Sequence, residues 1–217
     1  MTLRETTIQK ILEKKVIAII RNFDWETCVK AAEALQAGGI ELVEVTFNQS
    51  NSESFINTQK AIAQINECFP GMLAGAGTVL TREQVDMAAD AGAKYIISPD
   101  FNPDIIRHTR EKGLVSIPGA LTPSEITGAH RAGADFVKLF PAGELGTGYI
   151  KAIRAPISHI RLLAVGGVNE ENMAEFLKAG VCGIGAGGNL LNKKWIAEGA
   201  YNRITDLARK YAEQANI

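Results

Sequence analysis

The sequence has few of the residues that build metal sites and disulfide frameworks. Its 217 residues include three cysteines and three histidines, and its formal net charge is -1. An odd number of widely spaced cysteines favours reduced structural thiols over disulfides or a zinc site. The histidines show no metal-ligand spacing, and we expect each of them at the surface. These residues are Cys28, Cys68, Cys182, His108, His130 and His159.

Long apolar runs and basic clusters are also missing, which limits the partners of the protein. No apolar run approaches the roughly 18 residues needed to span a membrane, and residues 1–5 lack the apolar core of a signal peptide. No basic cluster indicates a nucleic-acid surface. With 46% hydrophobic and 22% charged residues, the chain can bury one large core. We therefore expect a cytoplasmic protein with a single domain over residues 1–217 and no membrane or nucleic-acid partner.

One pattern recurs along the whole chain: short apolar runs alternate with helical segments. The runs begin near Val16, Glu41, Met72, Lys94, Leu114, Asp135, Arg161 and Val181. Eight such strands without a long linker predict an α/β fold, a closed (β/α)8 TIM barrel. The residues up to Lys14 are predicted to form an extra N-terminal helix, and residues 193–217 to close the ring. A doubly wound open sheet is the alternative, but no Gly-x-Gly-x-x-Gly follows the first strand.

The ends of the predicted helices carry capping signals. Thr81 and Thr122 each precede a Gln or Glu at capping-box spacing, and Asn102 precedes a proline at the first helical position. At the other end, a glycine stands shortly before the next strand, where helices commonly close in a left-handed residue. These glycines are Gly38, Gly92, Gly113, Gly133 and Gly180.

Lys138 is a cation inside the apolar run of residues 135–142. Burying an unpaired lysine ammonium costs several kcal/mol or drives off the proton, and a neutral lysine amine can form a Schiff base with a carbonyl compound. Alternation places Phe136, Lys138 and Phe140 on one strand face and the aliphatic Val137 and Leu139 on the other. We expect Lys138 to face the barrel interior. A solvated lysine at a strand end is the alternative.

Glu44 is expected on the inward face of the second strand, as Lys138 is on that of the sixth. Val43 and Val45 share an apolar face, which leaves Glu44 pointing into the barrel interior. Schiff-base chemistry needs both a nucleophilic amine and a carboxyl group that shuttles protons, so Glu44 and Lys138 are candidates for these roles. A structural ion pair between the two is the competing explanation.

Glycine-rich segments follow the last two strands, where barrels frequently bind phosphate through backbone amides. They contain Gly166 and Gly167 in the first segment and Gly187 and Gly188 in the second. Tight turns would equally explain them. Their position after both strands favours a phosphate or carboxylate site.

Several segments together resemble class I aldolases of the 2-keto-3-deoxy-6-phosphogluconate and 4-hydroxy-2-oxoglutarate (KDPG/KHG) aldolase family. The resemblance extends over nearly the full length of the chain. No single matching segment would identify the family, but their combination in this order is highly specific for it. They are residues 16–21, 37–46, 75–80, 97–99, 117–119, 137–142 and 165–168.

The resemblance implies a role for each candidate residue. It implies that Lys138 forms the Schiff base with pyruvate or the 2-keto acid and that Glu44 is the general acid and base. It places Thr78 near the pyruvyl carboxylate and Phe140 against the substrate. The backbone amides of the glycine segments after strands seven and eight are expected to hold the phosphate or a distal carboxylate. The resemblance also implies a homotrimer without metal or organic cofactor.

Two departures from the family pattern bear on the substrate. The family commonly has Leu-Arg after Glu-Val-Thr, whereas this chain has Phe47-Asn48. A phosphogalactonate-cleaving branch resembles this chain in having the asparagine, together with an arginine after the first strand, so Arg21 is the expected carboxylate clamp. Gly188 replaces a frequent serine, a loss of about 1 kcal/mol of phosphate binding for one hydroxyl donor. Asn189 could compensate for it.

The leading hypothesis is a lyase that reversibly cleaves 2-dehydro-3-deoxy-6-phosphogluconate or 4-hydroxy-2-oxoglutarate. The products would be pyruvate and either glyceraldehyde 3-phosphate or glyoxylate. A 2-dehydro-3-deoxy-6-phosphogalactonate aldolase, a phosphate-barrel isomerase or synthase without an imine, and a barrel that only binds an anion are the alternatives.

Overall fold

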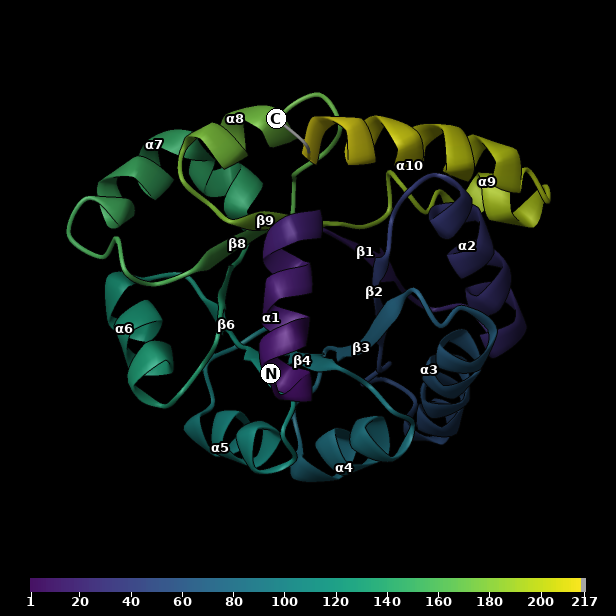
Figure 1. Ribbon diagram of the computed structural model, residues 1–217, viewed down its shortest axis with the longest axis horizontal. Helices are drawn as coiled ribbons and strands as arrows, with labels where there is room; N and C mark the ends of the chain where they lie inside the picture. The colour runs from purple at the N-terminus through teal and green to yellow at the C-terminus, as the bar shows by residue number, and fades with distance from the viewer. Residues whose placement is uncertain (216–217) are drawn as a thin grey trace.

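The computed structural model describes residues 1–215, which form a parallel β-barrel surrounded by helices (Figure 1). All the described strands belong to one sheet with the order β5-β4-β3-β2-β1-β9-β8-β7-β6. The expected TIM-barrel architecture is confirmed. The strands are β1 (Val16–Ile20), β2 (Leu42–Thr46), β3 (Leu73–Gly77), β4 (Tyr95–Ile97), β5 (Val115–Ile117), β6 (Gly119–Ala120), β7 (Val137–Leu139), β8 (Leu162–Val165) and β9 (Gly183–Ala186).

The described sheet has nine strands instead of the expected eight because Pro118 divides the fifth one. Proline has no N–H to donate to a ladder, so pairing is interrupted at this residue. β5 pairs with β4, and β6 pairs with β7, so the two halves of one strand join opposite ends of the sheet. The carbonyl of Pro118 still accepts a hydrogen bond of 2.8 Å from the Lys138 N–H, which completes the ring beside Lys138.

The helices form a ring outside the strands, and Figure 1 shows α1 lying across one end of the barrel. As expected, a helix precedes the first strand. The segment from residue 193 forms two helices, the second of which contacts α2 and α8 and so closes the ring of helices; residues 216 and 217 lie outside the described residues. The helices are α1 (Leu3–Lys14), α2 (Trp25–Ala37), the 3-10 turn η1 (Ser52–Ser54), α3 (Phe55–Cys68), α4 (Arg82–Asp90), α5 (Pro103–Glu111), α6 (Pro123–Arg131), α7 (Ala142–Arg154), α8 (Met173–Lys178), α9 (Lys193–Ala197) and α10 (Tyr201–Ala215).

The predicted helix starts are confirmed, and one predicted helix end is wrong. Thr81 and Thr122 form reciprocal capping boxes, and the Asn102 side chain accepts from the N–H of Asp104. Four of the five glycines have positive φ, but Gly38 has φ -91° and Gly39 takes the left-handed conformation instead. Gly38 is needed for another reason: a Cβ there would lie 2.5 Å from the Cβ of Ala208 in α10. The C-terminal helix packs directly against it.

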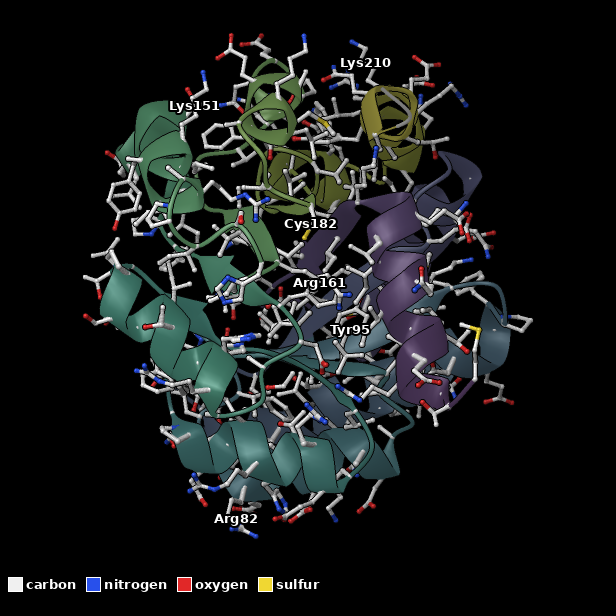
Figure 2. The ribbon with its side chains drawn as sticks, turned by 60° about the vertical axis from the view of Figure 1, so that its left-hand side comes forward. Arg82, Tyr95, Lys151, Arg161, Cys182 and Lys210 are labelled. Atoms are coloured by element: carbon white, nitrogen blue, oxygen red, sulfur yellow. The ribbon has the colours of Figure 1, made fainter. Side chains whose placement is uncertain are left out.

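Two apolar clusters separate the inside of the barrel from the layer beneath the helices. Val43, Val45, Val137 and Leu139 belong to the cluster between sheet and helices, as their strand phase predicts. The interior cluster contains Ile17, Leu42, Tyr95, Ile97, Val115, Ile117, Phe136 and Leu163. In Figure 2 Tyr95 lies inside the molecule, whereas Arg82, Lys151 and Lys210 project from the outer helices. Lys138 shares the inward phase of Phe136.

Helix α1 seals the end of the barrel at which the strands begin. Ile8 and Ile11 belong to the interior cluster, and Ile11 is fully buried. Ion pairs fasten the helix at both ends, between Arg4 and Asp135 and between Lys10 and Glu41. Among the described helices none combines the length and apolar character needed to cross a lipid bilayer.

The expectation of surface histidines holds for His130 and His159 but is wrong for His108, which is 8% exposed. Its Nε2 lies 2.9 Å from Asp86 and its Nδ1 lies 3.0 Å from Arg82, both on α4. The ring is therefore buried between α4 and α5 because polar partners on the neighbouring helix satisfy both nitrogens. The three cysteines are free, and burial raises the pKa of Cys28 to about 12.

Candidate active site

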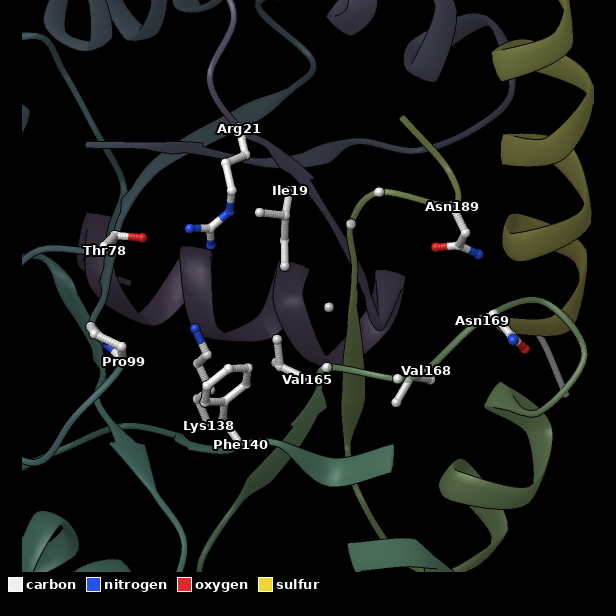
Figure 3. Close-up of a pocket in the computed structure, with 15 residues that line it drawn as sticks. Ile19, Arg21, Thr78, Pro99, Lys138, Phe140, Val165, Val168, Asn169 and Asn189 are labelled. Atoms are coloured by element: carbon white, nitrogen blue, oxygen red, sulfur yellow. The ribbon is translucent and has the colours of Figure 1, made fainter. Parts of the chain in front are cut away.

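The predicted site residues gather at the carboxyl ends of the strands, opposite the end sealed by α1. A cavity of about 470 Å³ opens there, and Figure 3 shows Arg21, Thr78 and Lys138 converging on it from three different strands. Its lining consists of Ile19, Arg21, Thr78, Pro99, Lys138, Phe140, Val165, Gly166, Gly167, Val168, Asn169, Gly185, Gly187, Gly188 and Asn189. Ile19, Pro99, Val165 and Gly185 were not predicted as site residues, although alternation from their strands would have placed them on the inner face.

Lys138 lies at the centre of β7 and is 4% exposed. Burial lowers the pKa of its amine; the nearby carboxyl of Glu44 opposes this shift, and the guanidinium of Arg21 adds to it. Among the described residues the ammonium makes no hydrogen bond or ion pair, and it lies 5.1 Å from the centroid of the Phe140 ring. An unpaired amine with a lowered pKa is available as a nucleophile.

Glu44 is 1% exposed and is not among the residues that line the cavity. Its Oε1 has no hydrogen-bond partner in the described part of the chain. Burial raises the pKa of this carboxyl, while Lys138 and Arg21 oppose the rise. No ion pair within 4 Å joins Glu44 and Lys138, both of which are described, so the structure does not contain the structural ion pair that competed with the catalytic interpretation.

Strand β3 makes the space that Glu44 occupies. A Cβ on Gly77 would lie 1.7 Å from Oε1 of Glu44, and a Cβ on Gly75 would lie 2.1 Å from the ring of Tyr95. The Tyr95 hydroxyl donates a 2.7 Å hydrogen bond to the carbonyl of Val43, which fixes the ring in this position. Sequence reasoning did not assign these roles. The sequence feature that could have revealed them is glycine at two alternate positions of β3, Gly75 and Gly77, both of which face the barrel interior.

Arg21 and Thr78 face Lys138 across the cavity (Figure 3). Within the described residues the guanidinium of Arg21 has no hydrogen bond or ion pair, so all its donors are available to an anion. Thr78 has φ 56°, an unusual conformation for a β-branched residue, and its carbonyl accepts a 2.6 Å bond from the side chain of Gln49. Such strain is found where a side chain is held for function.

Asn48 does not line this cavity. It lines a neighbouring one of about 280 Å³ between the ends of β1 and β2 and helices α2 and α3, and its side chain accepts a 3.1 Å hydrogen bond from the N–H of Ser50. Arg21 is thus the arginine that the structure brings to the cavity.

The two glycine-rich segments differ in what an added side chain would meet. Gly166 and Gly167 have φ of 85° and 74°, and a Cβ on either would lie 3.0 or 2.9 Å from the Phe140 ring or from Gly143. Side chains are therefore excluded from the first segment. A Cβ on Gly187 or Gly188 would meet nothing within 4 Å, so the second segment leaves open space beside the cavity.

Asn189 cannot replace the missing serine hydroxyl as a donor. Its amide nitrogen donates to the carboxylate of Glu170 at 2.9 Å and also to the hydroxyl of Tyr211. These two bonds use both amide hydrogens. Figure 3 shows the side-chain oxygen of Asn189 on the side of the cavity, so this residue presents an acceptor there.

Metal ligands are not grouped in the described part of the chain: residues 1–215 hold no cluster of three or more His, Cys, Asp or Glu side chains placed for a metal ion.

Comparison with known proteins identifies relatives over most of the chain. Residues 7–207 match the family model described as KDPG and KHG aldolase. A probable 2-dehydro-3-deoxy-6-phosphogalactonate aldolase of Rhizobium meliloti is 38% identical over 82% of each chain. A 2-dehydro-3-deoxy-phosphogluconate aldolase of Treponema pallidum is 35% identical over 94% of this chain and 95% of its own.

The fold of this chain is also similar to that of a solved aldolase structure. The crystal structure of KDPG aldolase from Legionella pneumophila, with pyruvate captured at low pH as a covalent carbinolamine intermediate, superposes with a TM-score of 0.84. It is 29% identical, and the match covers 94% of this chain and 98% of that one. The chain therefore belongs to the KDPG and KHG aldolase family and is an aldolase, a carbon–carbon lyase.

Proposed function

We propose that this aldolase cleaves a phosphorylated 2-keto-3-deoxy sugar acid into pyruvate and glyceraldehyde 3-phosphate through an imine on Lys138. The supporting observation is the environment of Lys138, a buried amine whose pKa burial lowers and which points unpaired into the cavity. A neutral amine in this position attacks the C2 carbonyl of a bound 2-keto acid.

The carbon chemistry then follows from the imine. The nitrogen of Lys138 bonds to C2, water leaves the carbinolamine, and the iminium accepts the electron pair of the breaking C3–C4 bond. The proton of the C4 hydroxyl passes to a base, and an aldehyde and an enamine result. Protonation of the enamine at C3 and hydrolysis release pyruvate and restore the lysine. Glu44, whose pKa burial raises, is the carboxyl group that we assign to moving these protons.

The remaining cavity residues suit the two anionic ends of such a substrate. Arg21 and Thr78 lie across from Lys138, where the C1 carboxylate would stand, and a guanidinium binds a carboxylate with two parallel hydrogen bonds. Phe140, which is 41% exposed, provides an apolar wall. The backbone amides near Gly166, Gly167, Gly187 and Gly188 are assigned to the distal phosphate.

Among the phosphorylated substrates, we favour 2-dehydro-3-deoxy-6-phosphogalactonate. Arg21 lines the cavity while Asn48 lies outside it, which fits the phosphogalactonate-cleaving branch resembled by the sequence. The Rhizobium meliloti relative carries the corresponding name. The phosphogluconate epimer and 4-hydroxy-2-oxoglutarate are the competing substrates.

Borohydride trapping tests the imine. Incubation of the wild-type protein with pyruvate and sodium borohydride should add one reduced pyruvate unit to the intact protein, and peptide mapping should place it on Lys138. The variant Lys138→Ala should remain unmodified. An isomerase, a synthase or a barrel that only binds anions would give no adduct, and an adduct that persists in the variant would refute the assignment.

Substrate preference is tested by comparing kcat/KM for pyruvate release from the two phosphorylated C4 epimers and from 4-hydroxy-2-oxoglutarate. The highest value is expected for the galactonate epimer. A higher value for the gluconate epimer would reverse the preference and leave the reaction unchanged. The homotrimer and the cytoplasmic location expected from the sequence remain predictions, and sedimentation velocity would measure the former.

A further inference from the structure

A third, smaller cavity adjoins the main one at the second glycine segment. It has a volume of about 110 Å³ and shares Ile19, Arg21, Gly187 and Gly188 with the lining of the main cavity. The residues that it adds are Phe23, Leu191 and Lys193. Because no side chain stands on Gly187 or Gly188, nothing at these positions separates the main cavity from Lys193.

The segment that carries Lys193 is firmly held. Leu190 and Leu191 are buried, and the N–H of Leu191 donates a 3.0 Å hydrogen bond to the carbonyl of Gly187. Asn192 caps the following short helix α9 by accepting from the N–H of Lys194 at 2.9 Å. The backbone at Lys193 is thereby fixed relative to the glycine segment.

Lys193 differs from its neighbour Lys194 in its partners. Lys194 lies 4.0 Å from the carboxylate of Glu198. Lys193 has no ion pair or side-chain hydrogen bond within the described residues, although it is exposed and cationic. Its charge is available to an anion that enters from the cavity.

Arg21 also lines both cavities, but it is assigned to the C1 carboxylate, and apart from it the distal end of the main cavity offers a phosphate little beyond backbone amides. Gly188 has no hydroxyl, and the donors of Asn189 are used by Glu170 and Tyr211. The carboxylate of Glu170 and the carbonyl oxygen of Asn189 both disfavour a dianion nearby. A phosphate monoester, which carries nearly two negative charges at neutral pH, needs a cation at this end.

We propose that Lys193 supplies that cation by binding the distal phosphate of the substrate across Gly188, and that it thereby selects phosphorylated over unphosphorylated 2-keto-3-deoxy sugar acids. This inference rests on the proposed function. It makes Lys193 a specificity-determining residue that acts on substrate binding and leaves the imine chemistry at Lys138 unchanged.

The test compares Lys193→Met with Lys194→Met, a matched change of the adjacent lysine. Steady-state kinetics are measured with a phosphorylated 2-keto-3-deoxy sugar acid and with the same compound without phosphate. For Lys193→Met we expect KM for the phosphorylated substrate to rise by about five- to tenfold, the scale of one hydrogen bond of typical net strength. The unphosphorylated compound should be cleaved as by wild type, and Lys194→Met should match wild type with both.

Ionic strength and inorganic phosphate provide independent readouts. The difference in KM between wild type and Lys193→Met should shrink as salt is raised, because an exposed charge is screened. Inorganic phosphate should inhibit wild type competitively and Lys193→Met more weakly.

Two outcomes would overturn the inference: an unchanged KM for the phosphorylated substrate in Lys193→Met, or an equal rise in Lys194→Met, which would indicate general surface electrostatics. Either result leaves the proposed function intact as long as the wild type releases pyruvate and is trapped by borohydride. Failure of the wild type in those two assays would instead refute the proposed function itself.

Discussion

The two halves of the barrel interior are built from the same strands and have opposite characters. In β2 the inward residue Leu42 is followed two positions later by Glu44, and Phe136, directly before β7, is followed two positions later by Lys138 within that strand. Two residues advance a strand by about 6.6 Å, so this short step separates a packed apolar layer from a layer with unpartnered ionisable groups. The lower half is closed by α1, and the upper half opens into the cavity.

This contrast indicates that the lower layer contributes mainly to the stability of the fold and the upper layer mainly to the proposed reaction. The lower layer buries apolar side chains against Ile8 and Ile11 and holds the strands in register. The upper layer keeps Glu44 and Lys138 desolvated without an ion pair, which lowers stability but suits both groups to the proton transfer and nucleophilic attack that we propose for them. Changes in the two layers should therefore affect different measurements.

The largest effect is expected from Lys138→Met, which replaces the amine of the upper layer by an apolar side chain. Pyruvate release should fall below detection because no other lysine among the described residues lines the main cavity, while the protein stays folded by circular dichroism. Lys94→Met, at the opposite end of the barrel just before β4, is the control and should retain activity. Substantial turnover in Lys138→Met would contradict the assigned nucleophile.

Glu44→Gln should have the next largest effect. Loss of a general acid and base lowers kcat by about 10²- to 10⁴-fold, while borohydride trapping with pyruvate becomes slower but still occurs on Lys138. The control is Glu41→Gln, a change in a carboxylate that pairs with Lys10 and Lys14 outside the cavity and that should keep kcat near the wild-type value. Equal losses in both variants would argue against a specific role for Glu44.

Ile11→Ala removes packing from the lower layer. It should lower stability and leave activity nearly unchanged, the reverse of what is expected for Lys138→Met and Glu44→Gln. Truncation of a fully buried isoleucine costs about 2–5 kcal/mol of unfolding free energy, which urea denaturation measures. The kcat of the folded protein should stay close to that of the wild type. Ile56→Ala, at a residue that is 63% exposed, should change the unfolding free energy by less than about 0.5 kcal/mol. A large loss of kcat in Ile11→Ala would show that the two layers are coupled.

The smallest effect is the pH dependence of stability. The folded-state pKa of Glu44 is raised above 4.5, so its protonated form stabilises the fold below that value and this contribution is lost as pH rises through the folded pKa. The folded-state pKa of Lys138 is lowered below 10.5, so its contribution is present above 10.5 and is lost as pH falls through the folded pKa. At neutral pH both groups therefore lower the unfolding free energy.

Denaturation across pH measures this directly. The stability gain of Glu44→Gln over wild type should grow as pH rises above 4.5, and that of Lys138→Met should shrink as pH rises toward 10.5. Glu41→Gln should behave in the opposite sense to Glu44→Gln: burial raises the Glu41 pKa, but the ion pairs with Lys10 and Lys14 outweigh this and lower it. Gains that do not vary with pH would contradict the assigned shifts.

Local patterns were enough to predict the strands and the inward phase of Glu44 and Lys138, because side-chain alternation in a strand follows from the backbone alone. They were also enough for the capped helix starts, which depend on residues three positions apart. They failed where the partner is distant in the sequence. His108 is buried because Asp86 and Arg82 lie on the neighbouring helix, and Pro118 divides a strand whose two halves pair with different neighbours.

The sequence by itself determined the repeating strand and helix pattern, the strand face of Lys138 and the resemblance that led to the aldolase family. Only the tertiary structure decided that Glu44 has no ion pair with Lys138 and sits over Gly77, that Asn48 lies outside the cavity while Arg21 lines it, and that Asn189 has no free donor. The physical reason is that burial, and with it pKa and hydrogen bonding, depends on which strands and helices meet in space. Periodicity in a chain specifies a face, and packing specifies what that face contacts.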